Sequence, residues 1–213
     1  MGVLDGKSCL VIGDRNSLFR AVVAELESAG AWVGPIAAPE TADAAWRDAV
    51  MDKRQGPAKI DAIVSLCLPD AGGGFGKATL NDFRRVLDAS YVRNFLALKY
   101  GVQVLRAGGG GVFITVTSAD GMTGVEGAAP RCAASQGIVL MTRSAAVECA
   151  AKDDNVRVNA VMVGDIVGGD SSRQSPGHVT VEDVTSTVAY LVSDAASYLT
   201  ALILPVANGG PRP

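Results

Sequence analysis

Short apolar runs alternate with longer amphipathic stretches along the whole chain. A short apolar run bounded by glycine or polar residues predicts a buried parallel strand, whereas apolar residues spaced three and four apart predict a helix. The expected strands are residues 8–13, 31–37, 60–66, 112–117, 156–163 and 202–206. The expected helices are residues 17–29, 41–54, 80–107, 131–152 and 180–192.

This alternation predicts one doubly wound α/β domain over residues 1–213, a parallel sheet with helices on both faces. Residues 38–59, between the second and third strands, leave room for only one helix, whereas a strand–helix–strand unit takes roughly 30 or more residues. We therefore expect six strands, with the usual edge strand after the second one deleted. Pro35 fits an edge position because it has no N–H to donate. The polar segment 164–180 is expected to be a shortened lid or substrate loop.

Composition and charge indicate which kinds of binding partner and metal site are expected. The chain has 213 residues, is 48% hydrophobic and carries a formal net charge of -3, so neither nucleic acid nor an anionic membrane is expected as a partner. The N-terminus lacks a secretory signal pattern, and a cytoplasmic location is expected. Cys9 and Cys67 fall in apolar strands, where we expect buried free thiols. With His178 the only histidine, expected in a solvated loop, no metal site is predicted.

Residues 131–148 resemble, without a gap, the central helix of the short-chain dehydrogenase/reductase family. In that family the segment opens with Tyr-x-x-x-Lys, but this chain has Arg131 and Ser135 at the two positions, while the pattern through Glu148 is kept. The resemblance extends over residues 6–13, 61–64, 157–161 and 198–210. It implies a Rossmann-like fold, and in an intact member it implies NAD(P)-dependent dehydrogenase chemistry.

The cofactor positions implied by the resemblance are altered. The family's Gly-x-x-x-Gly-x-Gly loop brings backbone close to the pyrophosphate and lets helix and strand pack tightly. Only its first glycine remains. The four vestigial cofactor positions are Gly13, Ser17, Phe19 and Ser65, the last of which opens the segment at the family's Asn-Asn-Ala-Gly motif. Asp14 adds a negative charge that Arg15 could offset. We therefore expect no tight NAD(P) binding by this chain.

The catalytic positions implied by the resemblance are also altered. Ser118 stands at the position of the family's substrate-holding serine, and Ser90 replaces the asparagine that supports a proton-relaying water. Arg131 replaces the tyrosine, and a guanidinium cannot release a proton near neutral pH. Ser135 replaces the lysine, so no ammonium remains to lower the pKa of a neighbour. We expect no intact catalytic residue and no hydride transfer by this chain alone.

The segments that keep the family pattern are helices 80–107 and 131–152 and the C-terminal strand, which form oligomer interfaces in the family. The chain resembles the catalytically silent subunit type of hetero-oligomeric members, such as hydroxybenzylsuccinyl-CoA dehydrogenase of anaerobic toluene degradation. This resemblance implies a non-catalytic subunit that supports an active homologous subunit, with NAD(P) bound in that partner. A homo-oligomer is also compatible with these surfaces.

Two alternatives stay open at this point. The emptied cleft could serve a non-redox enzyme of the lyase or isomerase kind, with Ser118, Asp120, Arg131 and Cys132 close together. Arg131 would then clamp a carboxylate, and Cys132 would be a nucleophile with a depressed pKa. The simpler interpretation is that Arg131 fills the vacated space or reaches solvent and that Cys132 is inert. The chain could also be a small-molecule binding or regulatory module.

Overall fold

The computed structural model describes residues 2–52, 56–68, 70, 73–166 and 178–207. Its main sheet has six strands in the order β2-β1-β3-β4-β5-β8, and every neighbouring pair is parallel. The strands are β1 (Ser8–Gly13), β2 (Trp32–Ala37), β3 (Ala62–Leu66), β4 (Gly111–Ser118), β5 (Val156–Val163) and β8 (Ile203–Val206). The predicted six-stranded, doubly wound α/β fold is therefore confirmed.

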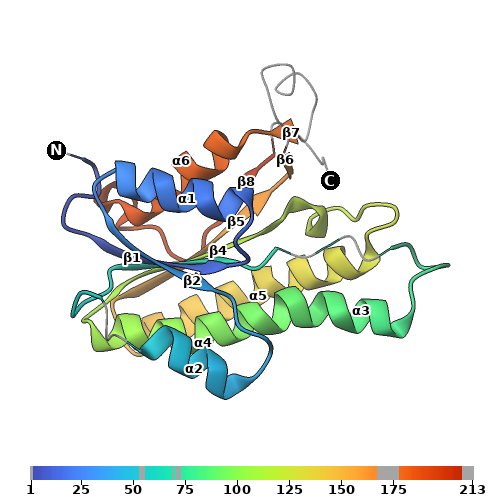
Figure 1. Ribbon diagram of the computed structural model, residues 1–213, viewed down its shortest axis with the longest axis horizontal. Helices are drawn as coiled ribbons and strands as arrows, with labels where there is room; N and C mark the ends of the chain where they lie inside the picture. Colours follow the sequence, from blue (N-terminus) through green and yellow to red (C-terminus); the bar gives the residue numbers. More distant parts are fainter. Residues whose placement is uncertain (1, 53–55, 69, 71–72, 167–177, 208–213) are drawn as a thin grey trace.

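Helices cover both faces of the sheet (Figure 1). One layer consists of α1 (Ser17–Ser28) and α6 (Val181–Val192), which share a core with the apolar residues on one face of the strands. The other consists of α2 (Asp43–Met51), α3 (Leu80–Leu87), α4 (Arg93–Ala107) and α5 (Ala129–Ala151), over a second core cluster. Within the described ranges, no helix combines the length and the apolarity needed to cross a membrane.

Strand β2 is the free edge of the sheet, as predicted, and α2 is the single helix between β2 and β3. The N–H of Trp32 donates to the carbonyl of Lys7, just before β1, at 2.9 Å, and the N–H of Ala38, just after β2, donates to Gly13 of β1 at 3.0 Å. Because alternate residues of a parallel strand bond to opposite neighbours, Pro35 turns its nitrogen away from β1 and toward the open edge. The proline therefore removes no hydrogen bond from the sheet, and it leaves the edge with one donor fewer for a foreign strand.

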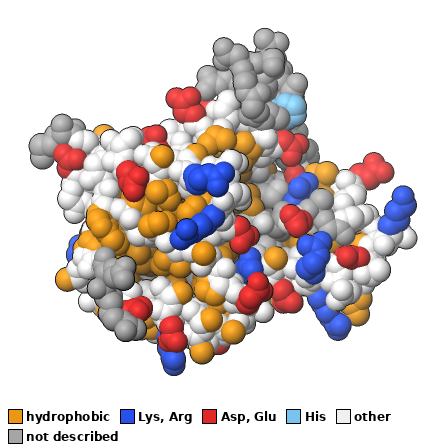
Figure 2. Space-filling model, in the orientation of Figure 1, with side chains coloured by type: hydrophobic (Ala, Val, Ile, Leu, Met, Phe, Trp, Pro, Cys, Tyr) orange, Lys and Arg blue, Asp and Glu red, His pale blue; other side chains and the backbone are white. Residues whose placement is uncertain are grey.

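Apolar side chains gather on the surface along α1 and β2, beside this open edge (Figure 2). Pro35 lines a hollow of about 440 Å³ together with residues of α1 and the loop before it, among them Arg15, Phe19 and Arg20. On the other face of β2, Pro35 borders a hollow of about 280 Å³ under Trp32. The missing strand and helix therefore leave surface on both sides of β2 only partly covered.

The single helix predicted over residues 80–107 is interrupted. Between α3 and α4 the chain makes a π-helical turn, Asp88–Val92, in which the N–H of Arg93 donates to the carbonyl of Asp88, five residues earlier. A π-turn inserts one extra residue into a helix and is frequent at functional sites. Ser90, one of the vestigial catalytic positions, lies in this turn.

The segment 164–180 also differs from the expected loop. Strands β6 (Asp165–Ile166) and β7 (His178–Val179) pair in parallel, so the predicted loop residue His178 lies in a short strand and is half-buried. Residues 167–177 of the predicted lid lie outside the described residues. Helix α6 then begins with a capping box in which Thr180 and Asp183 exchange hydrogen bonds.

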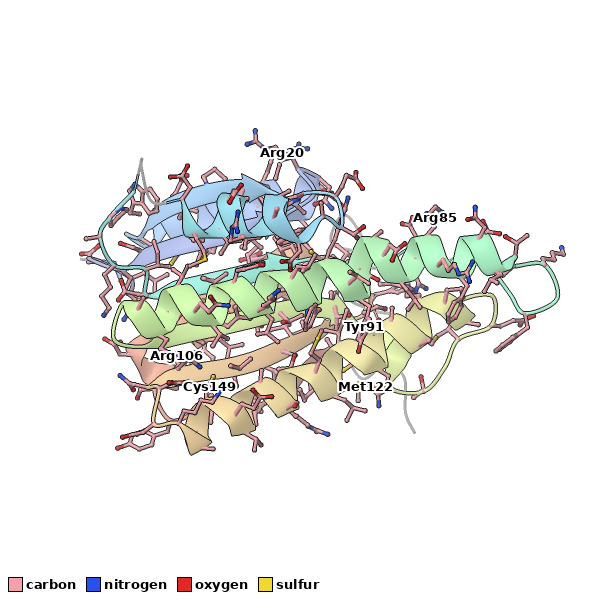
Figure 3. The ribbon with its side chains drawn as sticks, turned by 90° about the horizontal axis from the view of Figure 1, so that it is seen from below. Arg20, Arg85, Tyr91, Arg106, Met122 and Cys149 are labelled. Carbon is pink, nitrogen blue, oxygen red and sulfur yellow. The ribbon has the colours of Figure 1, made fainter. Side chains whose placement is uncertain are left out.

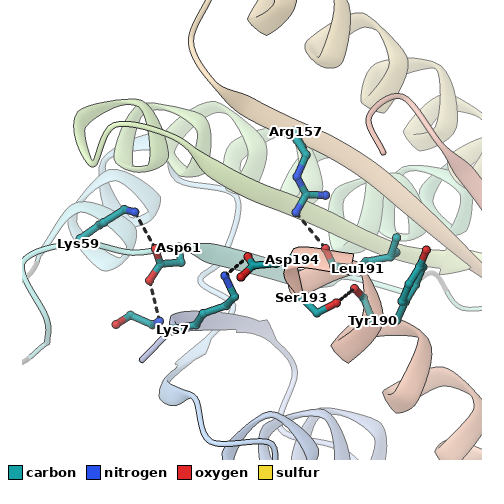
Figure 4. A network of polar contacts seen from close by, with 9 residues as sticks. Lys7, Lys59, Asp61, Arg157, Tyr190, Leu191, Ser193 and Asp194 are labelled. Atoms are coloured by element: carbon teal, nitrogen blue, oxygen red, sulfur yellow. Dashed lines mark hydrogen bonds and ion pairs between the residues drawn. The ribbon is translucent and has the colours of Figure 1, made fainter. Parts of the chain in front are cut away.

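A polar network connects residues around the amino-terminal ends of the strands (Figure 4). The vestigial positions lie at the opposite, carboxyl ends of the strands. Lys7 pairs with Asp194 at 2.6 Å, and Asp61 accepts a hydrogen bond from the N–H of Ser8 at 2.9 Å. The guanidinium of Arg157 on β5 donates to the carbonyl of Leu191 at the end of α6. The contacts of Asp194 and Leu191 tie the end of α6 to the base of the sheet.

Candidate vestigial cofactor and catalytic site

The vestigial positions collect at the carboxyl ends of β1, β3 and β4. The chain passes from β1 to β2 on one side of the sheet and returns to β3 on the other, so the strand order reverses between β1 and β3. In open parallel sheets, ligands bind in the crevice at such a reversal. The residues around this crevice therefore decide whether a nucleotide has room.

The turn after β1 is closed by the chain's own side chains. Asn16 caps α1, and its Oδ1 accepts a hydrogen bond from the N–H of Phe19 at 2.9 Å. The side chain of Phe19 is only 3% exposed and belongs to the core under α1. A Cβ added at Gly13 would lie 3.3 Å from Cδ2 of Phe19 and 2.9 Å from the Cβ of Leu66. The ring thus lies directly against Gly13, whereas Ser17 at the start of α1 is exposed.

An arginine that the sequence interpretation did not single out spans the same crevice. Arg93, at the start of α4, places Nη1 3.2 Å from Asp14 and Nη2 3.5 Å from Glu40. The Arg93 side chain is 12% exposed, while the two carboxylates are largely exposed. The cation paired with Asp14 is therefore Arg93. It connects the loops after β1 and β2 to α4.

The segment at the end of β3 folds into the interior. Ser65 is fully buried, and its hydroxyl donates to the Sγ of Cys67 at 3.6 Å. Burial raises the pKa of the Cys67 thiol to about 11 and that of Cys9 to about 12. The expectation that both cysteines are buried thiols is therefore confirmed, and Ser65 bonds to the protein itself.

Ser118 ends β4, and its Oγ accepts a hydrogen bond from the N–H of Asp120 at 3.2 Å. The guanidinium of Arg131 forms an ion pair with the carboxylate of Asp120, and the two side chains are 24% and 14% exposed. Three of the four residues expected to lie close together, Ser118, Asp120 and Arg131, are therefore connected. Cys132 follows Arg131 on α5 and is half-buried.

The remaining catalytic positions are fully buried. The hydroxyl of Ser90 donates to the carbonyl of Val86 at 2.6 Å, so it is turned toward its own helix. Ser135 packs against the loop after β4, where a Cβ added at Gly121 would lie 2.8 Å from the Cβ of Ser135.

Helices α4 and α5 lie side by side (Figure 3), and three large apolar side chains on them are exposed. Phe95, Leu140 and Val147 are 48%, 58% and 66% exposed. A hollow of about 380 Å³ runs between the two helices. Its lining combines apolar residues such as Met141 with charged residues such as Lys99 and Glu148.

Comparison with known proteins shows which family and which enzymes this chain is similar to. The family model for short chain dehydrogenases matches residues 3–175. The 2,5-dichloro-2,5-cyclohexadiene-1,4-diol dehydrogenase LinX of Sphingobium indicum is 26% identical, over 94% of this chain and 85% of the relative. The cis-4-hydroxycyclohexanecarboxylate dehydrogenase of Sinomonas cyclohexanicum is 30% identical, over 95% of this chain and 86% of the relative.

Solved structures agree on the fold. A short-chain type dehydrogenase/reductase from Mycobacterium ulcerans superposes with a TM-score of 0.86 at 20% identity, covering 98% of this chain and 90% of the other. A protein from Burkholderia xenovorans, described as a short-chain dehydrogenase/reductase, gives 0.86 at 24% identity, covering 98% of both chains. The sheet order, the matched sequence model and these relatives lead to one conclusion: the chain belongs to the short-chain dehydrogenase/reductase family.

Proposed function

We propose that this chain is a non-catalytic member of its family that associates with an active NAD(P)-dependent alcohol dehydrogenase or ketoreductase of the same family. The observation that carries the proposal is the position of Phe19, whose ring lies against Gly13 at the turn where a dinucleotide would approach the backbone. The dehydrogenase relatives act on cyclic alcohols according to their names, which suggests an alcohol or ketone substrate for the partner.

The residues around the crevice do not fit a dinucleotide. A pyrophosphate at a helix start needs free backbone N–H groups and close approach to glycine. Here Asn16 takes the N–H of Phe19, and the aromatic ring fills the place of the third glycine. The ion pairs of Arg93 with Asp14 and Glu40 cross the same crevice. We infer that NAD(P) is not bound tightly by this chain and is held by the partner.

The catalytic positions support the same proposal. Hydride transfer to a carbonyl needs a proton donor near the substrate oxygen, and neither Arg131 nor Ser135 can take that role near neutral pH. The ion pair with Asp120 also argues against the lyase-like alternative. An anionic substrate clamped by Arg131 would have to displace a carboxylate already in place. A supporting role therefore fits the arrangement better than a replacement chemistry.

The outer face of α4 and α5 is the docking surface that we propose for the partner's corresponding helices. Leu140 and Val147 lie two turns apart on α5 and are both exposed, with the exposed Arg143 and Ser144 between them. Phe95 is an exposed apolar side chain on α4. Large exposed apolar side chains among polar ones are compatible with an association surface, whose apolar centre is bordered by polar residues. Strand β8, at the other edge of the sheet, offers a second surface. A homo-oligomer through the same surfaces is the competing assembly.

Titration of the isolated chain with NADH and NADPH tests the cofactor part. We expect no saturable change in nucleotide fluorescence below roughly 1 mM, an affinity of about 4 kcal/mol or less. An intact family member measured alongside serves as the positive control. Tight binding of either nucleotide to the isolated chain would overturn this part of the proposal.

Co-expression with an intact family member from the same genome tests the association. We expect co-purification, and we expect Leu140→Asp together with Val147→Asp to weaken the complex at least about tenfold, because two charges enter an apolar contact. Val3→Asp is the matched control, since Val3 is 72% exposed and lies in the turn before β1, outside α4, α5 and β8. Sedimentation velocity reports the assembly. A chain that forms only its own oligomers beside every intact relative contradicts the proposal.

A further inference from the structure

Four polar side chains at or beneath the vestigial site are buried and have no hydrogen-bond partner among the residues that the structure describes. Asn94, Thr115, Thr117 and Ser135 are each at most 1% exposed. Within the described part of the chain, neither the amide nitrogen nor the amide oxygen of Asn94 has a hydrogen-bond partner, and nor do the three hydroxyls. Other buried hydroxyls nearby are satisfied: Thr142, for example, donates to the carbonyl of Ile138 at 2.9 Å.

The four side chains share the layer between β4 and the helices α4 and α5. Thr115 and Thr117 alternate along β4 with Val116, which belongs to the core on the opposite face of the sheet. They therefore face α4 and α5, like Phe113 in the second core cluster. The structure thus places two neighbouring hydroxyls on the same side of one strand.

Asn94 lies level with these hydroxyls. A Cβ added at Gly101 would lie 2.6 Å from the ring of Phe113, so Gly101 sits directly over Phe113. Asn94 precedes Gly101 by two helical turns, roughly 11 Å. Because α4 runs antiparallel to β4, the same distance along the strand leads roughly three residues beyond Phe113. This point falls between Thr115 and Thr117.

Ser135 borders the same layer from α5. Its Cβ abuts Gly121 in the loop after β4, and the nearby Gly137 abuts the ring of Tyr91 in the π-turn. Tyr91 is seen between the α3–α4 run and α5 in Figure 3. The N-terminal part of α5 is therefore pressed against both the end of β4 and the start of α4, with Ser135 turned inward.

We propose that Asn94, Thr115, Thr117 and Ser135 form an internal binding site for a cluster of water molecules. Buried amides and hydroxyls are almost always hydrogen-bonded, and ordered water serves those that lack a protein partner. The set holds donors and acceptors but no charge, which suits a small neutral ligand rather than an ion. This site is independent of the subunit role and does not depend on a partner being bound.

A high-resolution crystal structure of the full chain tests the site directly. We expect ordered waters within hydrogen-bond distance of the Asn94 amide and of at least two of the three hydroxyls. Magnetic relaxation dispersion in solution should detect the same waters as long-lived internal molecules. A layer without water density, or side chains rotated so that they bond to one another, would overturn the proposal.

Thr117→Val provides a second test, because valine matches threonine in shape and lacks the hydroxyl. If water binds there, the variant removes one of its partners, and Tm should fall by about 2–4 °C with fewer long-lived waters. If the layer is dry, the variant removes an unsatisfied hydroxyl, and Tm should rise, which refutes the site. Thr117→Ser keeps the hydroxyl and should keep the waters. Thr142→Val, which removes a hydroxyl bonded to its own helix, should leave the number of long-lived waters unchanged.

Discussion

Phe19→Ala should destabilise the protein strongly, because the ring that replaces a family glycine is part of the core. The side chain is 3% exposed and packs with the residues under α1. A buried aromatic side chain covers about 150–250 Å² and contributes about 25 cal/mol per Å², or roughly 4–6 kcal/mol. Alanine keeps the Cβ, so we expect a loss of about 3–5 kcal/mol in the free energy of unfolding. Tm should fall by about 6–20 °C.

Urea unfolding followed by far-UV circular dichroism measures this loss. Phe75→Ala is the matched control: Phe75 is 94% exposed, so the same chemical change there should stay within about 0.5 kcal/mol of the wild type. A loss below about 1 kcal/mol for Phe19→Ala would mean that the ring stands in an open crevice, and the argument for a filled cofactor turn would fail.

Three further predictions concern single side chains. Cys132 should react with Ellman's reagent at pH 8 while Cys9 stays unmodified until the protein unfolds, because burial raises the pKa of Cys9 to about 12. Peptide mass spectrometry identifies the labelled thiol, and labelling of Cys9 in the folded protein contradicts its burial. Hydrogen bonds from Thr79 lower the pKa of Asp82 below its usual 3.8, so the stabilisation they give is present above pH 3.8 and is lost as the pH falls through the lowered pKa. The difference in unfolding free energy between the wild type and Asp82→Ala should therefore shrink in acid. An unchanged difference refutes the assignment. Pro35→Val restores a backbone donor at the open sheet edge and should increase concentration-dependent association in light scattering, unless the edge is covered in solution.

The number of strands and the free edge could be predicted because both follow from local features. Each apolar run is long enough to define a strand, and the short interval over residues 38–59 excludes a second helix–strand unit. The paired strands β6 and β7 have two residues each, too few to leave a periodic pattern. The π-turn was missed because the amphipathic pattern continues through it with only one residue added.

The altered site positions could be located from the family pattern, but their new partners could not. Arg93 and Asp14 are separated by 79 positions, and their pairing depends on how α4 crosses the end of β1. Arg93 follows Ser90 by three residues, about one helical turn. This spacing could have predicted that Arg93 borders the same crevice as Ser90. Asn94 gave no signal, since a polar residue in a helix is ordinary until packing shows that it is buried without a partner.

The π-turn at Asp88–Val92 makes the number of residues in this stretch as important as their identity. Its extra residue sets the rotation of α3, whose half-buried Phe83 and buried Val86 face inward, relative to α4. Deleting one residue would restore a regular helix and turn α3 by about 100° about its axis. Phe83 and Val86 would then point away from their present neighbours. A deletion in this stretch would therefore disturb the packing of α3 as a whole, whereas a substitution of an exposed residue there would not.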